Sequence, residues 1–386
     1  MRAADAMSPD ATDAAATTVR TLHPGAADPV ATGLLASLAA AAPGASTVAV
    51  AVHRAGERLV AVGGRTAHDA TGRPAEPGTR FALGSVTKTY TALLLAELAA
   101  RGEVGYDDPI DRFLPPGAAP YRRVGGAPIT LLHLATHTSG LPRLPPGLLR
   151  SAVPRWFSNP YAAYGPGELL AALARTRPSA APGTRVRYSN FGVGLLGMLL
   201  ARAAGEPYGG YERALAARVL TPLGLRSTGA QAGAAGDATG YWHGRPRPPW
   251  RIPGLAGAGA LHAGPEELLR YLEALLDPVR AAGGDGPLAT ALTEVARPRL
   301  VVRPGEDRIA LVWNARRRPG HLLLFHSGGT RGCTAFVGFS PERGVALAAV
   351  ANRAPALDGA FIQRAYLLLR ELAGGTTRFG APSPIG

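Results

Sequence analysis

The chain contains 386 residues, of which 46% are hydrophobic and 18% are charged. One hydrophobic core rarely organises a chain of this length, so we expect two structural units and exclude a peptide ligand or an isolated finger module. The formal net charge is +14, yet the arginines are spread along the chain and no basic stretch alternates with aromatic residues. We therefore expect no nucleic-acid partner. We also expect no membrane partner, since no apolar run approaches the roughly 18 to 20 residues that cross a bilayer.

Residues 1–27 are rich in Ala, Asp, Thr and Pro, and we expect them to be disordered. They lack the basic start and apolar centre of a secretory signal, so the expected location is cytoplasmic. The first predicted helix begins near Val30, with Asp28 as its cap and Pro29 in its first turn, and it ends before Pro43. This helix is a poor alternative signal sequence, because an acidic residue and a proline stand where positive charge is needed.

The middle of the chain predicts a hairpin, a long helix and then a helical region. β-branched residues from Ser46 onward predict two strands that turn at Ala55-Gly56. A long helix should follow, from Ser85 to Arg101. Beyond it, Pro- and Gly-rich loops separate four helical patterns, near residues 131–136, 167–175, 191–204 and 211–220.

The last third of the chain predicts further strands. After a helix that ends near Leu276, strand patterns cover residues 308–313, 321–326, 334–339 and 345–351, and a closing helix covers 360–372. Both ends of the chain should thus contribute to one sheet. We therefore expect a discontinuous α/β domain over 28–105 and 255–372, a mostly helical domain inserted at 106–254, and a flexible tail at 373–386.

The basic residues contain one exception that points to chemistry. Of the 41 lysine and arginine residues, only Lys88 is a lysine. A guanidinium stays protonated in proteins, whereas burial can make a lysine amine neutral and therefore basic. The segment GSVTK places Ser85 and Lys88 three residues apart at the start of a helix, so both side chains share a face with the free N–H groups of that helix. The lysine can activate the serine as a nucleophile, although a serine cap and a surface lysine give the same pattern.

Two further segments carry polar residues suited to the same chemistry. In RYSNFG, Tyr188 can relay a proton and Asn190 can hold the lysine and a substrate carbonyl. In HSGGT, His326 ends an apolar strand, and Gly328 and Gly329 let the backbone approach a substrate. The Gly329 N–H, together with the Ser85 N–H, can stabilise an oxyanion. Each segment taken alone also fits ordinary packing.

Other motifs have structural interpretations. The GVGLLG segment that starts at Gly192 lacks the preceding strand and following acidic residue of a dinucleotide site, and we expect it to allow close helix packing. His133 and His137 lack a third metal ligand, so we expect capping or packing roles. Cys333, the only cysteine, is expected to be a buried thiol.

The motifs SVTK, YSN and HSG occur in this order, with THTSGLP at 136–142 and the flanks PGTRVRYSNFGVGLLG and HSGGTRGCTAFVGFSPERGVALAAVANR. Over residues 28–372 the chain resembles the serine β-lactamase and D,D-peptidase superfamily, and within it the class C β-lactamase and esterase-like branch. The resemblance implies an antiparallel sheet flanked by helices, a mostly helical domain, and an active site between them. It also implies that Ser85 is acylated, Lys88 and Tyr188 move protons, Asn190 supports them, and His326 and Gly328 lie on the cleft-side strand.

One departure from the family pattern bears on the substrate. Penicillin-directed members commonly carry Lys-Thr-Gly where this sequence has His326-Ser327-Gly328. The permanent cation that would bind a substrate carboxylate is thus replaced by a histidine, whose charge depends on its surroundings. This weakens a β-lactamase assignment and favours an esterase-like activity.

The sequence therefore predicts a serine hydrolase or acyltransferase that acts on a small ester or amide and requires no metal or organic cofactor. A transacylase that forms an amide with an amine acceptor is the first alternative, and a β-lactamase or D,D-peptidase is the second. A ligand-binding or sensor protein is the alternative without catalysis. The aromatic residues Trp156, Tyr161, Trp242, His243 and Trp250 are candidates for the substrate wall or for loop packing. The sequence does not indicate an oligomeric state.

Overall fold

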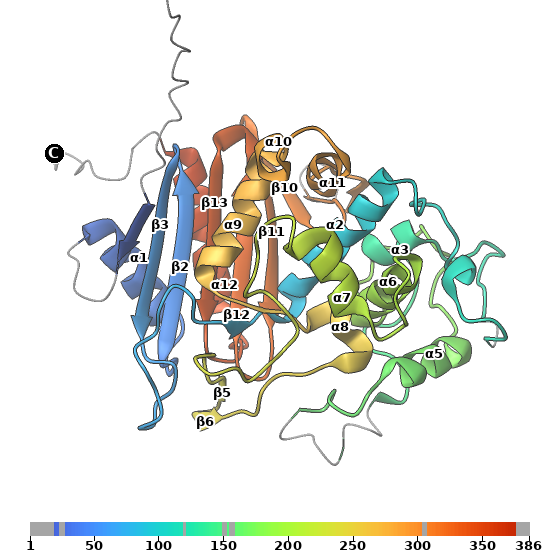
Figure 1. Cartoon of the computed structure of the whole chain (residues 1–386), viewed down its shortest axis with the longest axis horizontal. Helices are drawn as coiled ribbons and strands as arrows, with labels where there is room; N and C mark the ends of the chain where they lie inside the picture. The colour runs from blue at the N-terminus through green and yellow to red at the C-terminus, as the bar shows by residue number, and fades with distance from the viewer. Residues whose placement is uncertain are drawn as a thin grey trace, which may run out of the picture.

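The computed structural model describes residues 19–22, 28–118, 121–148, 153, 159–302 and 307–375. Its main feature is a nine-stranded sheet along one side of the molecule (Figure 1). In spatial order the strands are β1 (Val19–Leu22), β3 (Glu57–Gly64), β2 (Thr47–Arg54), β13 (Val345–Ala351), β12 (Thr334–Ser340), β11 (His321–Gly329), β10 (Asn314–Arg318), β9 (Asp307–Ile309) and β8 (Leu300–Val301). All neighbouring strands are antiparallel except β1 and β3. The expected fold class is therefore confirmed.

The N-terminal edge of the sheet corrects one expectation. Residues Val19–Leu22 were expected to be disordered within the segment 1–27, but they form β1, which pairs in parallel with β3. Without β1, the outer N–H and C=O groups of β3 would form an open sheet edge. The rest of that segment lies outside the described residues. The predicted hairpin is present, and positive φ angles at Ala55 (52°) and Gly56 (79°) make its two-residue turn.

The alternation of side chains in the central strands separates two hydrophobic layers. Val48, Val50 and Val52 of β2 face α1 (Pro29–Ala40) and α12 (Ala360–Gly374), whereas the alanines between these valines face the larger core on the other side. The helix α9 (Pro265–Leu276) covers that second face. Asp28 caps α1 as expected, because its carboxylate accepts a hydrogen bond from Val30 N at 2.8 Å.

Most of the remaining helices lie on the side of the molecule away from β1 (Figure 1). They are α2 (Thr87–Ala100), α3 (Leu131–Ala135), α5 (Pro166–Arg175), α6 (Asn190–Ala203), α7 (Tyr211–Leu215), α8 (Ala256–Gly259), α10 (Pro278–Ala282) and α11 (Pro287–Val295). The helix α2 packs against α6, α8 and α11, so it lies between the sheet-containing part and the helical part. The four helical patterns predicted between 131 and 220 all correspond to observed helices.

The GVGLLG segment has the structural role expected of it. A Cβ atom added at Gly194 would lie 2.4 Å from Leu255 Cδ2, and one added at Gly197 would lie 2.8 Å from Gly257 Cα. The two glycines therefore allow α6 to approach α8 at backbone distance. This close packing fixes the position of α8, which lies beside α2.

The prediction for the C-terminal strands is wrong in two places. The strand expected over 308–313 ends at Ile309, because the chain turns away at Val312 (φ 57°) to bury Trp313 completely in the core. The next strand, β10, was not predicted, since its sequence NARRR has no apolar alternation. It is held by pairing with β9 and β11 instead. The closing helix α12 continues to Gly374, so the expected flexible tail starts too early; residues 376–386 lie outside the described residues.

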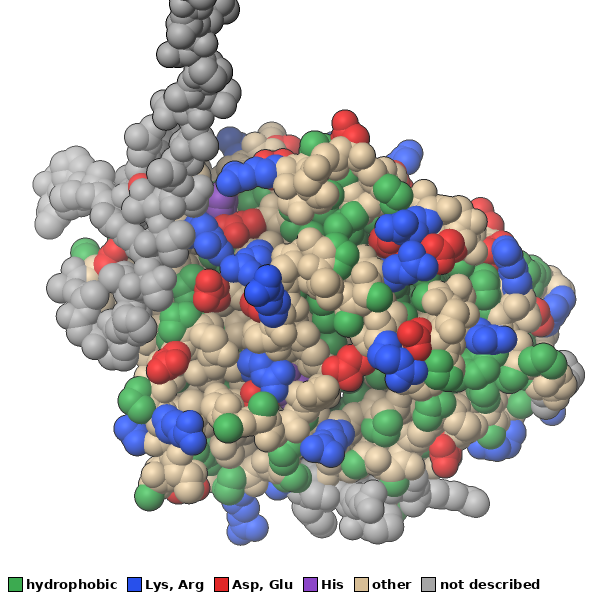
Figure 2. All heavy atoms as spheres, viewed as in Figure 1, with side chains coloured by type: hydrophobic (Ala, Val, Ile, Leu, Met, Phe, Trp, Pro, Cys, Tyr) green, Lys and Arg blue, Asp and Glu red, His purple; other side chains and the backbone are tan. Residues whose placement is uncertain are grey.

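Arginine and acidic side chains are interspersed over the face shown in Figure 2. No described helix combines the length and hydropathy needed to cross a bilayer. Cys333 is buried as expected, and burial raises the pKa of its thiol to about 12.

Gly197→Ala tests the contact between α6 and α8. The added methyl group meets the backbone of Gly257, so we expect this variant to lose about 1–3 kcal/mol of unfolding free energy. Gly33→Ala is the matched control, because Gly33 is exposed on α1 and a Cβ added there would have no atom within 4 Å. This variant should gain about 0.5–1 kcal/mol of unfolding free energy. Urea unfolding of both variants measures the difference, and equal stabilities would show that the contact is not tight.

Candidate active site

Ser85 lies in a single 3₁₀ turn, η1 (Gly84–Val86), that leads into α2. The turn is anchored from both sides. The short strand β4 (Phe81–Ala82) just before it pairs with β7 (His262–Ala263), and Leu83 N donates a hydrogen bond to Leu261 O at 2.8 Å. The N-terminal end of α2, where N–H groups have no partner within the helix, is thus held beside the segment that follows α8.

The end of strand β11 touches this turn through glycine backbone. Gly84 has φ +51°, and a Cβ added to it would lie 2.9 Å from Gly329 N. A Cβ added at Gly328 would lie 3.0 Å from Ser85 N. The amides of Ser85 and Gly329, the two expected oxyanion donors, therefore belong to segments in direct backbone contact. Side chains at Gly84 or Gly328 would separate these segments.

Lys88 is fully buried one helical turn after Ser85. Its Nζ atom lies 2.9 Å from Ser85 Oγ and donates a second hydrogen bond to Ala258 O of α8 at 2.7 Å. Burial lowers the pKa of the amine because the charged form loses its hydration. Tyr188 has the opposite effect, and the guanidinium of Arg143 lowers the pKa further. No described carboxylate forms an ion pair with Lys88, so the neutral amine is favoured.

Tyr188 reaches the same serine oxygen from the opposite chain segment. Its hydroxyl donates to Ser85 Oγ at 2.7 Å. The phenol ring lies 5.0 Å from Lys88 Nζ, 5.4 Å from the Arg143 guanidinium carbon and 4.7 Å from the His137 ring. Ser85 Oγ thus lies between an amine and a phenol, and the Arg143 guanidinium lies over the phenol ring.

The YSN segment is positioned by the chain around residue 140. Ser189 caps α6, because its hydroxyl accepts from Gly192 N at 2.8 Å, and it donates to Pro142 O at 2.7 Å. Asn190 N donates to Arg143 O at 2.9 Å. The side-chain oxygen of Asn190 is buried and has no hydrogen-bond partner among the described residues. The lysine contact expected of Asn190 is made by Ala258 O instead, and Asn190 faces the cavity described below.

The two histidines of the helical region have structural contacts. His133 completes a capping box with Thr130 at the start of α3. His137 adopts φ +59°, and its Nδ1 atom accepts from Ser189 N at 3.3 Å. Burial, with smaller effects from Lys88 and His326, lowers the pKa of His137 to about 3. The imidazole is therefore neutral and supports the backbone next to Tyr188.

His326 lies on β11, and only 3% of its surface is exposed. Its Nδ1 atom is 2.9 Å from Ser327 O, which can only accept, so Nδ1 carries the proton. Burial, followed by the effect of Lys88, lowers the pKa of His326 to about 3. At neutral pH this position is therefore an uncharged imidazole.

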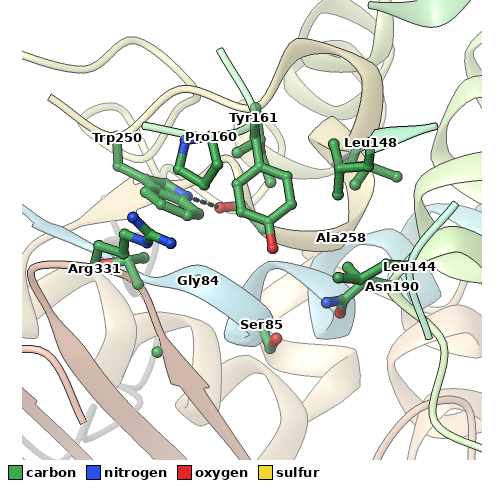
Figure 3. Close-up of a pocket in the computed structure, with 15 residues that line it drawn as sticks. Gly84, Ser85, Leu144, Leu148, Pro160, Tyr161, Asn190, Trp250, Ala258 and Arg331 are labelled. Carbon is green, nitrogen blue, oxygen red and sulfur yellow. Dashed lines mark hydrogen bonds between the residues drawn. The ribbon is translucent and has the colours of Figure 1, made fainter. Parts of the chain in front are cut away.

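A cavity of about 260 Å³ opens beside Ser85 (Figure 3). Its floor is Gly84 and Ser85, and the labelled Tyr161 and Trp250 lie above them. The other described residues that line it are Leu144, Leu148, Pro160, Asn190, Ile252, Leu255, Ala258, Gly259, Gly329, Thr330 and Arg331. Most of this lining is apolar, as in sites that bind small molecules.

The candidate aromatic wall is only partly present in this cavity. Tyr161 and Trp250 line it and pack edge to face, with ring centres 5.4 Å apart. Trp242 does not line it among the described residues, and its ring instead contacts Arg331 and His243. Trp156 lies outside the described residues.

A second cavity of about 230 Å³ is lined by Tyr188. His326 and His137 also line it, together with residues of β9 and β10 such as Arg308 and Arg316. Tyr188 therefore lines the second cavity and reaches Ser85 with its hydroxyl, whereas Ser85 lines the first cavity.

Three groups at the site were missed by the sequence analysis. The Ala258 carbonyl has no sequence signal, because any residue carries one. Arg143 and Arg331 stand in a background of many arginines, although each follows a quoted motif directly: Arg143 follows THTSGLP and Arg331 follows HSGGT. Its position two residues after a glycine pair at a strand end was the signal available for Arg331.

Comparison with known proteins agrees with this geometry. The model of the Beta-lactamase family matches residues 34–371. The chain is 28% identical over 297 residues to the D-alanyl-D-alanine-carboxypeptidase/endopeptidase AmpH of Escherichia coli (strain K12), covering 71% of each chain. It is 36% identical over 210 residues to Esterase EstB of Burkholderia gladioli, covering 51% of this chain and 50% of the esterase.

A solved structure supports the fold independently. The beta-lactamase/D-alanine carboxypeptidase of Pseudomonas syringae superposes with a TM-score of 0.74 at 23% identity, covering 89% of this chain and 98% of the other. The family match spans the serine, lysine and tyrosine that meet at Ser85 Oγ. The chain therefore belongs to the Beta-lactamase family of serine hydrolases and has the β-lactamase fold.

Proposed function

We propose that this protein is an esterase-like serine hydrolase that cleaves a small ester or amide through a covalent acyl-enzyme on Ser85. The observation that carries the proposal is the placement of Ser85 Oγ within hydrogen-bond distance of both Lys88 Nζ and Tyr188 OH. A buried amine with a lowered pKa can take the serine proton, and a serine becomes a good nucleophile only when a base does so.

In the proposed acylation step, neutral Lys88 accepts the Ser85 proton while Oγ attacks the substrate carbonyl. The amides of Ser85 and Gly329 donate to the oxygen that becomes negative. Lys88 and Tyr188 then return the proton to the leaving alkoxide or amine as its bond to the acyl carbon breaks. In the second step, a water molecule gives a proton to Lys88 and Tyr188 as it attacks the acyl carbon. The bond to Ser85 Oγ then breaks, Oγ takes the proton back, and the acid is released.

The neutral state of His326 favours a simple ester over a β-lactam. A β-lactam carries a carboxylate, and the cation commonly found at this strand position in penicillin-directed members is here an uncharged imidazole. The similarity to Esterase EstB supports the same preference. The activity of that esterase is a property of that protein and suggests the substrate class to test.

A transacylase is the second candidate, because a second cavity meets the site at Tyr188 and His326. An amine acceptor held there would contact Tyr188, whose hydroxyl lies 2.7 Å from Ser85 Oγ. Product analysis with and without added amines separates the two activities. Amide formation that exceeds acid release would favour the transacylase.

Ser85→Ala tests the acyl-enzyme. Wild type should release a burst of p-nitrophenol from a p-nitrophenyl ester and gain one acyl mass, whereas Ser85→Ala should lose activity by roughly 10³-fold or more and gain no mass. Ser179→Ala, in a loop outside the site, is the control. Absence of any adduct on wild type would favour the ligand-binding alternative. Hydrolysis of a chromogenic cephalosporin as fast as that of the ester would instead favour a β-lactamase.

Lys88→Arg tests the base. The guanidinium keeps the positive charge but cannot be deprotonated, so we expect ester turnover to fall by about 10²–10⁴-fold. Stopped-flow measurement of acylation gives the value, and circular dichroism checks that the variant is folded. Unchanged turnover in a folded variant would exclude Lys88 as the base.

The pH dependence of acylation tests which group titrates. Burial lowers the pKa of Lys88 below its ordinary 10.5, so the active neutral amine becomes more populated, and acylation faster, as pH rises through the lowered pKa. His326 has a pKa of about 3 and should not contribute near neutral pH. The rising limb should therefore keep its midpoint in His326→Gln. If the rise of the acylation rate with pH disappeared in this variant, the titrating group would be His326.

A further inference from the structure

One charged side chain lines the cavity beside Ser85 among the described residues, and it is Arg331. In Figure 3, Arg331 and Asn190 lie on opposite sides of Ser85, and Trp250 lies next to Arg331. The rest of the lining is apolar or contributes backbone, apart from the uncharged polar side chains of Ser85, Tyr161, Asn190 and Thr330. An arginine in such a cavity gives one end of it a strong preference for negative charge.

The backbone that carries Arg331 is held firmly. Thr330 N donates to Cys333 O at 2.9 Å, and Thr330 Oγ1 accepts from Cys333 N at 2.8 Å and from Gly332 N at 3.1 Å. A Cβ added at Gly332 would lie 2.8 Å from Gly240 Cα, so a second chain segment packs directly on this turn. Arg331 therefore projects from a fixed point a short distance beyond the oxyanion amide of Gly329.

A second arginine increases the positive potential at this end of the cavity. The guanidinium carbons of Arg331 and Arg247 lie 5.1 Å and 5.3 Å from the centre of the same Trp242 ring. Partial burial lowers the pKa of Arg331, Tyr161 opposes this, and the like charge of Arg247 lowers it further. Both arginines line an adjoining cavity that shares Trp250, Thr330 and Arg331 with the first, and its one acidic residue among those described, Asp237, is paired with Arg80. Because the charge of Arg247 already acts on Arg331, an anion bound beside Arg331 reduces this repulsion.

We infer that the acyl group of the substrate ends in a carboxylate that Arg331 binds, so that the preferred substrates are half-esters or half-amides of short dicarboxylic acids. The inference rests on the function proposed above. The reacting carbonyl lies at Ser85, the aliphatic part contacts the apolar lining, and the distal carboxylate faces Arg331. Arg247 strengthens the potential across Trp242.

The chemistry of the proposed step is unchanged by this assignment. The Ser85 Oγ–acyl bond forms, the bond from the acyl carbon to the leaving alkoxide breaks, and the serine proton goes to that alkoxide to give an alcohol. The distal carboxylate keeps its charge throughout. Arg331 is thus a specificity-determining residue, and its effect should depend on the charge of the acyl group and not on the leaving group.

A pair of esters that differ in one charge tests the inference. p-Nitrophenyl hydrogen adipate carries the distal carboxylate, and its methyl ester is neutral with the same chain. After correction for spontaneous hydrolysis, wild type should prefer the acid by about 10–100-fold in kcat/KM, as expected for a charge-assisted hydrogen bond. Arg331→Gln should bring the ratio of kcat/KM for the acid to kcat/KM for the neutral ester close to one.

Two further variants provide controls. Arg331→Lys keeps the charge without the planar pair of donors and should retain part of the preference. Arg317→Gln, exposed on β10, removes the same charge elsewhere and should leave the preference unchanged. An undiminished preference for the acid in Arg331→Gln, or equal kcat/KM for both esters in wild type, would overturn the inference.

A binding measurement separates failure of the inference from failure of the proposed function. Calorimetry on Ser85→Ala compares the mono-4-nitroanilide of adipic acid with its methyl ester. We expect the acid to bind more tightly than the methyl ester. Added salt, or the second substitution Arg331→Gln in the Ser85→Ala protein, should weaken binding of the acid. Equal binding of the two compounds would exclude the carboxylate site even if esters acylate Ser85. Selective binding without any acylation of wild type would retain the site and reject the hydrolase.

Discussion

The site depends on burying one amine that forms no ion pair with a carboxylate in the part of the chain that the structure describes. Lys88 is fully buried, and its hydrogen bonds go to a hydroxyl and a carbonyl. An ammonium group in this environment loses hydration that these two partners do not replace, so the neutral form is favoured. The same contacts place the amine on Ser85 Oγ. Burial therefore raises the neutral fraction of the amine, and the contacts of the buried amine hold it beside Ser85 Oγ.

Close backbone packing makes that burial possible. Gly197 lets α6 contact α8, whose Ala258 carbonyl then reaches the amine, and Gly84 and Gly328 let the start of α2 contact the end of β11. The sheet and the helical part are thus joined at the serine by contacts that admit no side chain. Because three segments distant in sequence meet there, the geometry of the site is coupled to the packing of the whole molecule.

The distribution of charge around the serine distinguishes this chain from penicillin-directed members with lysine on the cleft-side strand. That strand position is a neutral histidine, and the positive charge instead lies past the oxyanion amide, at Arg331 and Arg247. In the proposed reaction this moves recognition of an anion from the strand to the far end of the acyl cavity. The catalytic step and the choice of substrate are then served by different residues.

The sequence by itself determined the features that depend on local spacing. Ser85 and Lys88 are three apart at the start of a helix, and Tyr188 and Asn190 flank a helix cap. The β-branched residues of β2 and the strand pattern of β13 predict strands, and the ordered motifs indicate the family. Tertiary structure decided what depends on contacts between distant segments. It brought the Ala258 carbonyl to the amine, formed β10 by pairing alone, turned the chain at Val312 to bury Trp313, and placed Arg331 in the cavity. A backbone carbonyl, a strand without apolar alternation and one arginine among many carry no local signal, because their roles are set by neighbours that only folding supplies.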